Sequence, residues 1–260
     1  MKAAKSYNRG FLRRRGPTLT VLGWSVLLGL SAAAANILGG WLMTRREWDR
    51  RWLSFFVALG SGFMLATALA EMLPESMTLA PKTAPLAVIA GYALVHFLEH
   101  ALVPHFHFGE ETHAEEFLHP AKTLRVLLAL VVHTFFDGIA IASGFLVSPR
   151  LGWIVFSAVI LHKLPEGLTV ASVMLAGGSS RMRALGSAVL LGAATLAGVL
   201  VMGYSSGLLK YGLPLSAGVT LYVSATDLIP EANKEKGLRM AYVVLLGMGL
   251  MLAMRTLLPE

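Results

Sequence analysis

Two short segments of the sequence each pair a histidine with a carboxylate at a spacing of four residues. They are His133-Thr-Phe-Phe-Asp137 and His162-Lys-Leu-Pro-Glu166, and each lies in the middle of a long apolar run. Positions i and i+4 share one face of a helix, so each segment would present an imidazole and a carboxylate together. Two such helices facing each other would gather a ligand set that suits Zn²⁺ or a similar divalent metal. His133, Asp137, His162 and Glu166 are therefore the predicted main metal site.

The depth of these side chains supports the same interpretation. The two apolar runs are expected to be antiparallel neighbours, and both polar pairs fall near the midpoints of their runs. Ionisable groups at mid-membrane cost several kcal/mol unless they are paired, so they usually mark an ion or substrate pathway. Pro165 removes a backbone donor and frees the carbonyl near Leu161, which predicts an interrupted helix beside the site. Gly138 and Gly167 are expected to let helices approach closely.

The composition is that of a membrane protein. Hydrophobic residues make up 55% of the 260 residues and charged residues only 14%, whereas soluble domains carry about 25% charged residues. The chain has no cysteine, which excludes disulfides and thiolate metal sites. The net charge of +7 lies in loops and tails, so it predicts membrane orientation and not a nucleic-acid partner.

Eight apolar stretches are long enough to cross a bilayer, which takes roughly 20 residues each. The predicted fold class is an all-α integral membrane protein, a single transmembrane transporter domain over 1–260, because an open sheet could not survive in lipid. The predicted spans cover residues 18–43, 52–73, 84–103, 123–146, 151–177, 183–208, 212–232 and 238–258.

The N-terminal segment and the charges of the loops predict the topology. Arg13-Arg-Arg15, an apolar stretch and Ala32–Ala35 together resemble a cleavable signal peptide, but the apolar run continues to Met43. We therefore expect it to be retained as a first helix. Lys and Arg are concentrated in the connections after the first, third, fifth and seventh spans, which predicts that those loops are cytoplasmic and both termini extracytoplasmic. The basic N-terminal tail argues for the opposite orientation.

One connection is long. Residues 104–122 contain four His and four Glu, including Pro104-His105-Phe-His107 and Glu110-Glu111. The loop is expected on the cytoplasmic side, either as a solvated linker or as a flexible site of weak metal capture.

Further polar groups are placed along a predicted route through the helices. Glu71 is a candidate for the entrance, or alternatively an interfacial carboxylate. Near the inner end of the third span, three residues spaced i, i+3 and i+4 share one helix face. Together with an acidic residue of the seventh span, they are expected to form either an exit station for the metal or a structural network. Asn36 is expected to make a helix–helix hydrogen bond and not to bind metal. The exit candidates are His96, Glu99, His100 and Asp227.

These motifs resemble those of the ZIP (Zrt/Irt-like) metal transporters. His133-Thr-Phe-Phe-Asp137-Gly138 is similar to the family's helix 4 motif, and His162-Lys-Leu-Pro165-Glu166-Gly167 is similar to its helix 5 motif. Leu73-Pro74-Glu75 and Asp227-Leu-Ile-Pro230-Glu231 match two further motifs. The resemblance covers nearly the whole chain.

The resemblance implies an eight-helix ZIP-type bundle with helices 4 and 5 lining the pathway. It also implies uptake of Zn²⁺, and often Fe²⁺, Mn²⁺ or Cd²⁺, toward the cytoplasm across the plasma or inner membrane. Family members are usually homodimers in which a transport domain moves against a scaffold domain. The His and carboxylate ligands would also accept Co²⁺.

The sequence departs from the family near the predicted site. Some members hold a second metal with an Asn and an acidic residue where this chain has Thr134 and Lys163, and no acidic residue occurs in 183–208. We therefore expect Lys163 to pair with Asp137 and Glu166 and to replace the second cation, unless it points away into a helix contact. Phe136 stands where some relatives have Pro, so only the fifth helix is expected to be broken.

Transport would involve no chemical step. Two other functions are alternatives to it. An intramembrane zinc-dependent hydrolase would need three protein ligands, an open position and a general base. The metalloprotease pattern His-Glu-x-x-His is absent. A proton-coupled permease could use the same residues as a relay without metal. Ligands from two helices, with further polar groups toward both ends, favour a transport route, so no enzyme activity is expected.

Overall fold

The structure is a computed structural model that describes residues 19–45, 50–102, 120–235 and 238–259. These residues form helices and short connections with no strand, which confirms the predicted all-α fold. The helical runs are α2 (Leu19–Arg45), α3 (Arg50–Thr67) continuing through η1 (Ala68–Met72) and α4 (Leu73–Leu79), α5 (Ala84–Leu102), α6 (Pro120–Val147), α7 (Pro149–Ala176), α8 (Arg181–Tyr204), the short η3 (Ser206–Leu208), α9 (Leu209–Tyr222) continuing through η4 (Val223–Leu228) and α10 (Ile229–Ala232), and α11 (Arg239–Leu257).

All eight predicted spans are helical, with small shifts in their ends. The second run continues six residues beyond the predicted 52–73, to Leu79. Within the described ranges, seven helices are long and apolar enough to cross a membrane, and the run 209–232 is not among them. That run carries several polar side chains that are buried among the other helices. They are Ser216, Thr220, Ser224 and Asp227.

The chain is therefore a multi-pass membrane protein. The predicted His- and Glu-rich loop 104–122 lies outside the described residues as far as residue 119, and α6 begins at Pro120.

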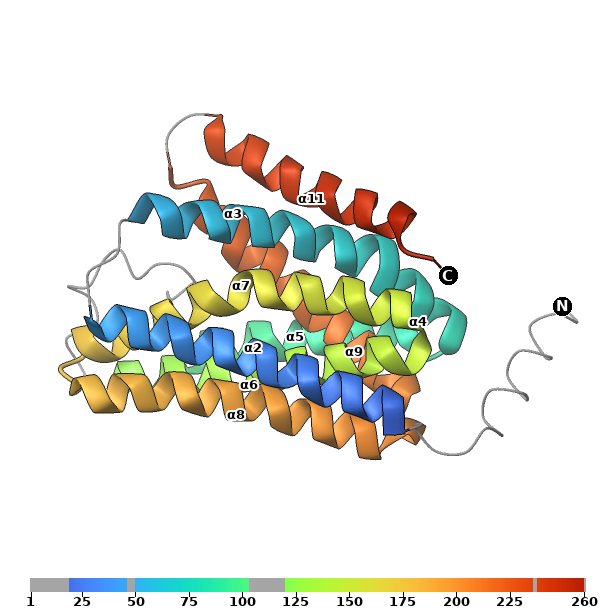
Figure 1. Cartoon of the computed structure of the whole chain (residues 1–260), viewed down its shortest axis with the longest axis horizontal. Helices are drawn as coiled ribbons and strands as arrows, with labels where there is room; N and C mark the ends of the chain where they lie inside the picture. Colours follow the sequence, from blue (N-terminus) through green and yellow to red (C-terminus); the bar gives the residue numbers. More distant parts are fainter. Residues whose placement is uncertain (1–18, 46–49, 103–119, 236–237, 260) are drawn as a thin grey trace, which may run out of the picture.

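The helices pack as two groups of four. The first group contains α2, α6, α7 and α8, which contact one another extensively. The second group pairs α3 with α11 and α5 with α9, and α3 also packs on η4 and α10. In Figure 1, α3 and α11 lie together at the top and α2, α6 and α8 at the bottom, with α7 between them. The two groups meet mainly where α3 contacts α7 and α6 contacts α9.

The predicted interruption of the fifth helix is wrong. The α7 helix runs through Pro165 without a break from Pro149 to Ala176. Pro165 removes one backbone donor, but the packing of α7 against α2, α3 and α6 keeps the helical path on both sides.

The deviations from regular α-helix occur in two other runs. The π segments η1 and η4 each end shortly before a proline, Pro74 and Pro230, whose rings would crowd the carbonyl four residues earlier. The wider turn of a π segment relieves this crowding, and such segments are frequent at functional sites. Glu71 and Asp227, two of the predicted pathway residues, lie in these segments.

The glycines after the two motif carboxylates lie at close helix contacts, which confirms the expected role. A Cβ on Gly138 would clash with the carbonyl oxygen of Thr195 in α8. A Cβ on Gly167 would clash with the carbonyl oxygen of Asn36 in α2. The polar side chains of α6 and α7 are therefore flanked by α8 and α2 at backbone contact.

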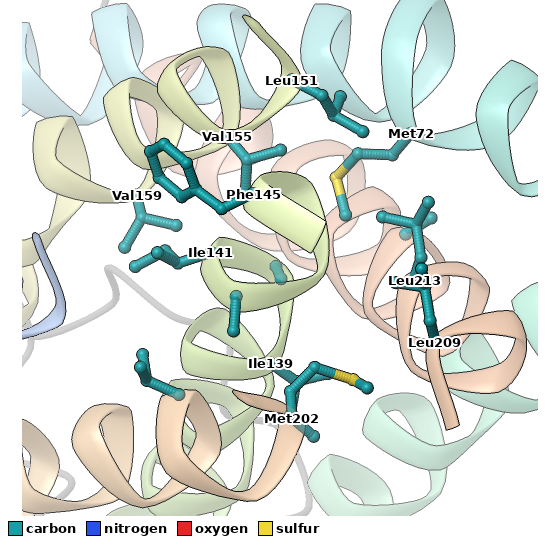
Figure 2. Close-up of a cluster of buried hydrophobic side chains, with 14 of the residues drawn as sticks. Met72, Ile139, Ile141, Phe145, Leu151, Val155, Val159, Met202, Leu209 and Leu213 are labelled. Carbon is teal, nitrogen blue, oxygen red and sulfur yellow. The ribbon is translucent and has the colours of Figure 1, made fainter. Parts of the chain in front are cut away.

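An apolar cluster fills the interface between the two groups at one end of the bundle, which we call the α6–α7 end. Figure 2 shows Phe145, Leu151 and Val155 of the first group close to Met72, and Leu209 and Leu213 of the second group beside them. All of these side chains are buried. The two groups are therefore joined at this end by packed apolar side chains.

Candidate metal centre

The helices α6 and α7 bring three of the four predicted ligands together. One ligand atom each from His133, Asp137 and His162 can be chosen so that all three lie within 4.8 Å of one another, and all three residues are buried. Asp137 Oδ2 lies 3.3 Å from His133 Nε2 and 3.2 Å from His162 Nε2. Among the described residues, no other group of three or more His, Cys, Asp or Glu meets the same criterion. A small movement of these side chains would give the donor set of a divalent metal site.

The orientation of His162 is set by its own helix. Its Nδ1 lies 3.0 Å from the backbone carbonyl oxygen of Ala158. A carbonyl only accepts, so Nδ1–H donates, and in a neutral ring Nε2 then carries the lone pair. That lone pair faces the carboxylate of Asp137. A neutral His162 ring could therefore ligate a metal ion through Nε2 while Nδ1–H keeps its bond to the backbone, which is the outer hydrogen bond and inner ligand arrangement found around metal-bound histidine.

The fourth predicted ligand, Glu166, is not part of this trio. Its Oε1 accepts a short hydrogen bond from the hydroxyl of Thr134. Its Oε2 accepts from the ammonium of Lys163 and, at 3.3 Å, from the amide Nδ2 of Asn36. The carboxylate is thus held by three side chains from α2, α6 and α7. The helix–helix hydrogen bond predicted for Asn36 is present, and its partner is Glu166.

Lys163 lies between the two carboxylates and not against lipid. Its Nζ contacts Oδ2 of Asp137 at 2.6 Å and also contacts Oε2 of Glu166. The side chain is fully buried, with an exposed fraction of 0%. The expected ion pairs of Lys163 are therefore present. Asp137 Oδ2 receives both imidazoles and this ammonium, so it is the atom on which the whole centre converges.

A cavity adjoins the centre at the contact between the two helix groups. Its walls come from the first group and from α3 and η4 of the second, and they include the histidines and Glu166. The lining residues are Val57, His133, His162, Pro165, Glu166, Thr169, Val223 and Leu228. Thr169 lies beyond Glu166 along α7, away from the α6–α7 end. The centre therefore has space on one side and the apolar cluster on the other.

Glu71, the predicted entrance residue, lies at the α6–α7 end in an ion-pair cluster. Its Oε1 is 2.8 Å from Arg255 Nε, and its Oε2 is 3.8 Å from Arg150 Nη2. Glu71 is buried with an exposed fraction of 7%. Arg255 belongs to α11 and Arg150 to the first turn of α7, so the cluster joins the two helix groups. No sequence pattern pairs these arginines with Glu71.

The four predicted exit residues divide into a buried pair and an exposed pair. Glu99 and Asp227 are buried, and their carboxyl groups lie close enough to interact electrostatically. Tyr222 was not among the predicted residues. Its hydroxyl donates to Glu99 at 2.7 Å and lies 3.4 Å from His96 Nδ1. His100 is exposed, and its Nδ1 lies 2.9 Å from the backbone oxygen of His96. Tyr222 directly precedes the π segment η4 and lies five residues before Asp227, and this position is the sequence signal for it.

Comparison with known proteins finds one family model and several relatives that match about half of the chain. The model of the ZIP zinc transporter family matches residues 118–255, just over half of the chain. The zinc transporter GufA of Myxococcus xanthus is 35% identical over 142 residues, 52% of this chain and 55% of that protein. The zinc transporter ZIP13 homolog of Drosophila melanogaster is 30% identical over 142 residues, 50% of this chain and 40% of that protein. The chain thus matches about half or less of the length of these relatives.

Proposed function

Because the chain belongs to the ZIP zinc transporter family, we propose that it carries a divalent transition metal, zinc first, across a membrane. The observation that carries this proposal is the convergence of His133, Asp137 and His162 from two antiparallel helices in a buried centre with an adjoining cavity. Imidazole and carboxylate ligands suit zinc, and the same donors accept Fe²⁺, Mn²⁺, Co²⁺ and Cd²⁺. Glu166 completes the proposed transport site by turning toward the metal or by acting through Lys163.

We also propose a direction for metal transport and a dimeric assembly of the protein. Metal moves toward the cytoplasm of the plasma or inner membrane, both termini are extracytoplasmic, and the protein works as a homodimer of one transport domain per chain. Lys and Arg in alternate connections support this orientation. The loop 104–122 then lies in the cytoplasm as an accessory site of weak metal capture.

The proposed route runs from the α6–α7 end, through the metal centre, to the opposite end. Glu71 would receive metal at the entrance once the arginines around it have moved. Glu99 and Asp227, with His96 and His100 beside them, would receive it at the exit. Paired carboxyls buried in a membrane protein usually lie on ion routes, which supports this assignment.

A zinc-dependent hydrolase built on the same trio is the alternative function. It would need a metal-bound water and a general base within reach of it. The carboxylate available for that role, Glu166, is engaged by Thr134, Lys163 and Asn36. Turnover of a peptide or ester by the purified protein with zinc would favour the hydrolase.

Replacement of the trio tests the transport proposal directly. In liposomes that contain the purified protein, we expect His133→Ala and Asp137→Ala to reduce zinc uptake at least about tenfold, since each removes one of the three ligands that converge at the centre. Glu235→Ala removes an exposed carboxylate far from the centre and is the matched control, with uptake unchanged. Near wild-type uptake by both trio variants would place the transport site elsewhere.

A further inference from the structure

The metal centre contains a cation of its own. Lys163 is fully buried, and its ammonium contacts the carboxylate oxygen of Asp137 that the two imidazoles also approach. On its other side it contacts Glu166. An incoming divalent metal would therefore share Asp137 with a fixed positive charge that cannot diffuse away.

We propose that Lys163 balances the charge of the centre between its empty and zinc-loaded states, and so keeps zinc binding weak enough for release. The inference rests on the proposed zinc transport. Counted with neutral imidazoles, the empty centre of Asp137, Glu166 and Lys163 has one net negative charge. With a divalent metal bound it has one net positive charge. The two states are equally charged in magnitude, so the apolar surroundings penalise them to a similar extent.

Without the lysine, the net charges of the empty and the zinc-loaded centre would differ in magnitude. The centre would have two net negative charges when empty and none when loaded. Burial in a low-dielectric interior would then destabilise the empty state strongly and favour the loaded one. A carrier with that centre would hold zinc tightly and return empty with difficulty. Lys163 removes this asymmetry by adding one positive charge to both states.

The neighbours of Glu166 keep the lysine in this role. Thr134 donates to one oxygen of Glu166, and Asn36 donates to the other, next to the ammonium. These bonds turn the carboxylate toward Lys163 and away from the trio. Asn36 Oδ1 has no hydrogen-bond partner within the described part of the chain, so the amide is free to serve as a second acceptor for the ammonium when zinc takes Asp137. Glu166 and Asn36 are thus positioning residues for Lys163.

Neutral replacements of Lys163 provide the test. Zinc affinity of the purified full-length protein is measured in detergent by competition with a fluorescent chelator. We expect both Lys163→Met and Lys163→Gln to bind zinc about tenfold more tightly or better, in spite of their different shapes. Net zinc uptake into liposomes should become slower for both. If both variants bind zinc no more tightly than the wild type, the charge-balance role is wrong and Lys163 is only a structural anchor.

A matched pair of Asn36 variants tests the effect of the charge of the centre while Lys163 is kept. Asn36→Asp adds one negative charge at nearly constant shape and should also tighten zinc binding, since the empty centre again gains a second net negative charge. Asn36→Leu has a similar size without charge; it removes the amide bond to Glu166 and should not tighten zinc binding. A tighter affinity in the Leu variant but not in the Asp variant would contradict the proposal.

The proposed transport site and the proposed role of Lys163 can be rejected separately. Equal zinc affinity for the wild type and His133→Ala would reject the transport site itself. Zinc binding and uptake that require His133, together with unchanged affinity in the Lys163 and Asn36→Asp variants, would reject only the role of Lys163.

Discussion

One carboxylate oxygen organises the centre at the scale of single residues. Asp137 Oδ2 lies 2.6 Å from the ammonium of Lys163 and 3.2 and 3.3 Å from the two imidazole Nε2 atoms. The backbone carbonyl of Ala158 fixes the ring of His162 so that its Nε2 faces this oxygen. The Nε2 lone pair of a neutral His162 ring is therefore directed toward Asp137, which lowers the cost of assembling a metal site there.

Acidification should weaken metal binding at this centre. A histidine must be neutral to coordinate, and protons compete with zinc for the Nε2 lone pairs of His133 and His162. We expect zinc affinity to fall by more than about tenfold as the pH is lowered from about 7.5 to about 5. Isothermal titration over this range measures it. An affinity that stays constant across the range would contradict ligation by histidine.

The residue types of the site could be predicted from sequence, but their grouping could not. Helical spacing placed His133 with Asp137 on one helix face and His162 with Glu166 on another. It could not show that Glu166 would be drawn from the trio by Lys163 and Thr134, because that depends on rotamers and on contacts between α6 and α7. Sequence also could not pair Arg150 with Glu71, because the two residues lie in different helices.

At the scale of the elements, glycine contacts decide which helices surround the centre. Gly167 follows Glu166 directly and lets the backbone of α2 approach α7 at Asn36. This approach puts the amide of Asn36 within 3.3 Å of the Glu166 carboxylate. The sequence showed that the glycines would allow a close contact, but it could not name α2 as the partner.

A methyl group at Gly167 should therefore disturb both stability and the centre. Gly167→Ala would force its Cβ against the backbone carbonyl of Asn36, which cannot rotate away. We expect a destabilisation of about 1–3 kcal/mol, typical of overpacking in a filled core, and weaker zinc binding.

Gly186→Ala is the matched control. It is also a glycine in a long helix, α8, but nothing lies within 4 Å of the added Cβ. This change should be neutral or stabilise by up to about 1 kcal/mol. Thermal unfolding in detergent compares the two variants. Equal melting temperatures would show that the α2–α7 contact is not tight.

Prolines were the least reliable guide to the elements. Pro165 predicted a broken helix, yet α7 is continuous, since its other hydrogen bonds and its neighbours on three sides keep its path. The π segments occur before Pro74 and Pro230, at Glu71 and Asp227. A proline shows that one donor is missing, and only the surrounding packing determines whether the helix widens, bends or continues.

At the scale of the whole molecule, the two ends of the interface between the helix groups differ. The apolar cluster around Phe145 and Met72 closes the α6–α7 end, and the Glu71 ion pairs with Arg150 and Arg255 join the groups there. The cavity beside the metal centre lies on the other side of it, lined by Thr169 and Leu228. The interface therefore has packed apolar side chains on one side of the candidate centre and a cavity on the other.

Cysteine labelling can test this asymmetry together with the proposed orientation, because the natural chain has no cysteine. Val155 and Thr169 lie on α7 on opposite sides of the centre, Val155 within the apolar cluster and Thr169 on the cavity wall. In inside-out vesicles, a small membrane-impermeant thiol reagent should modify Thr169→Cys from the cytoplasmic side. Val155→Cys should resist modification from either side, since packed apolar side chains exclude the hydrated reagent.

Modification of Thr169→Cys only from the extracytoplasmic side would reverse the proposed topology. Rapid modification of Val155→Cys from one side would show that the cluster does not close that end.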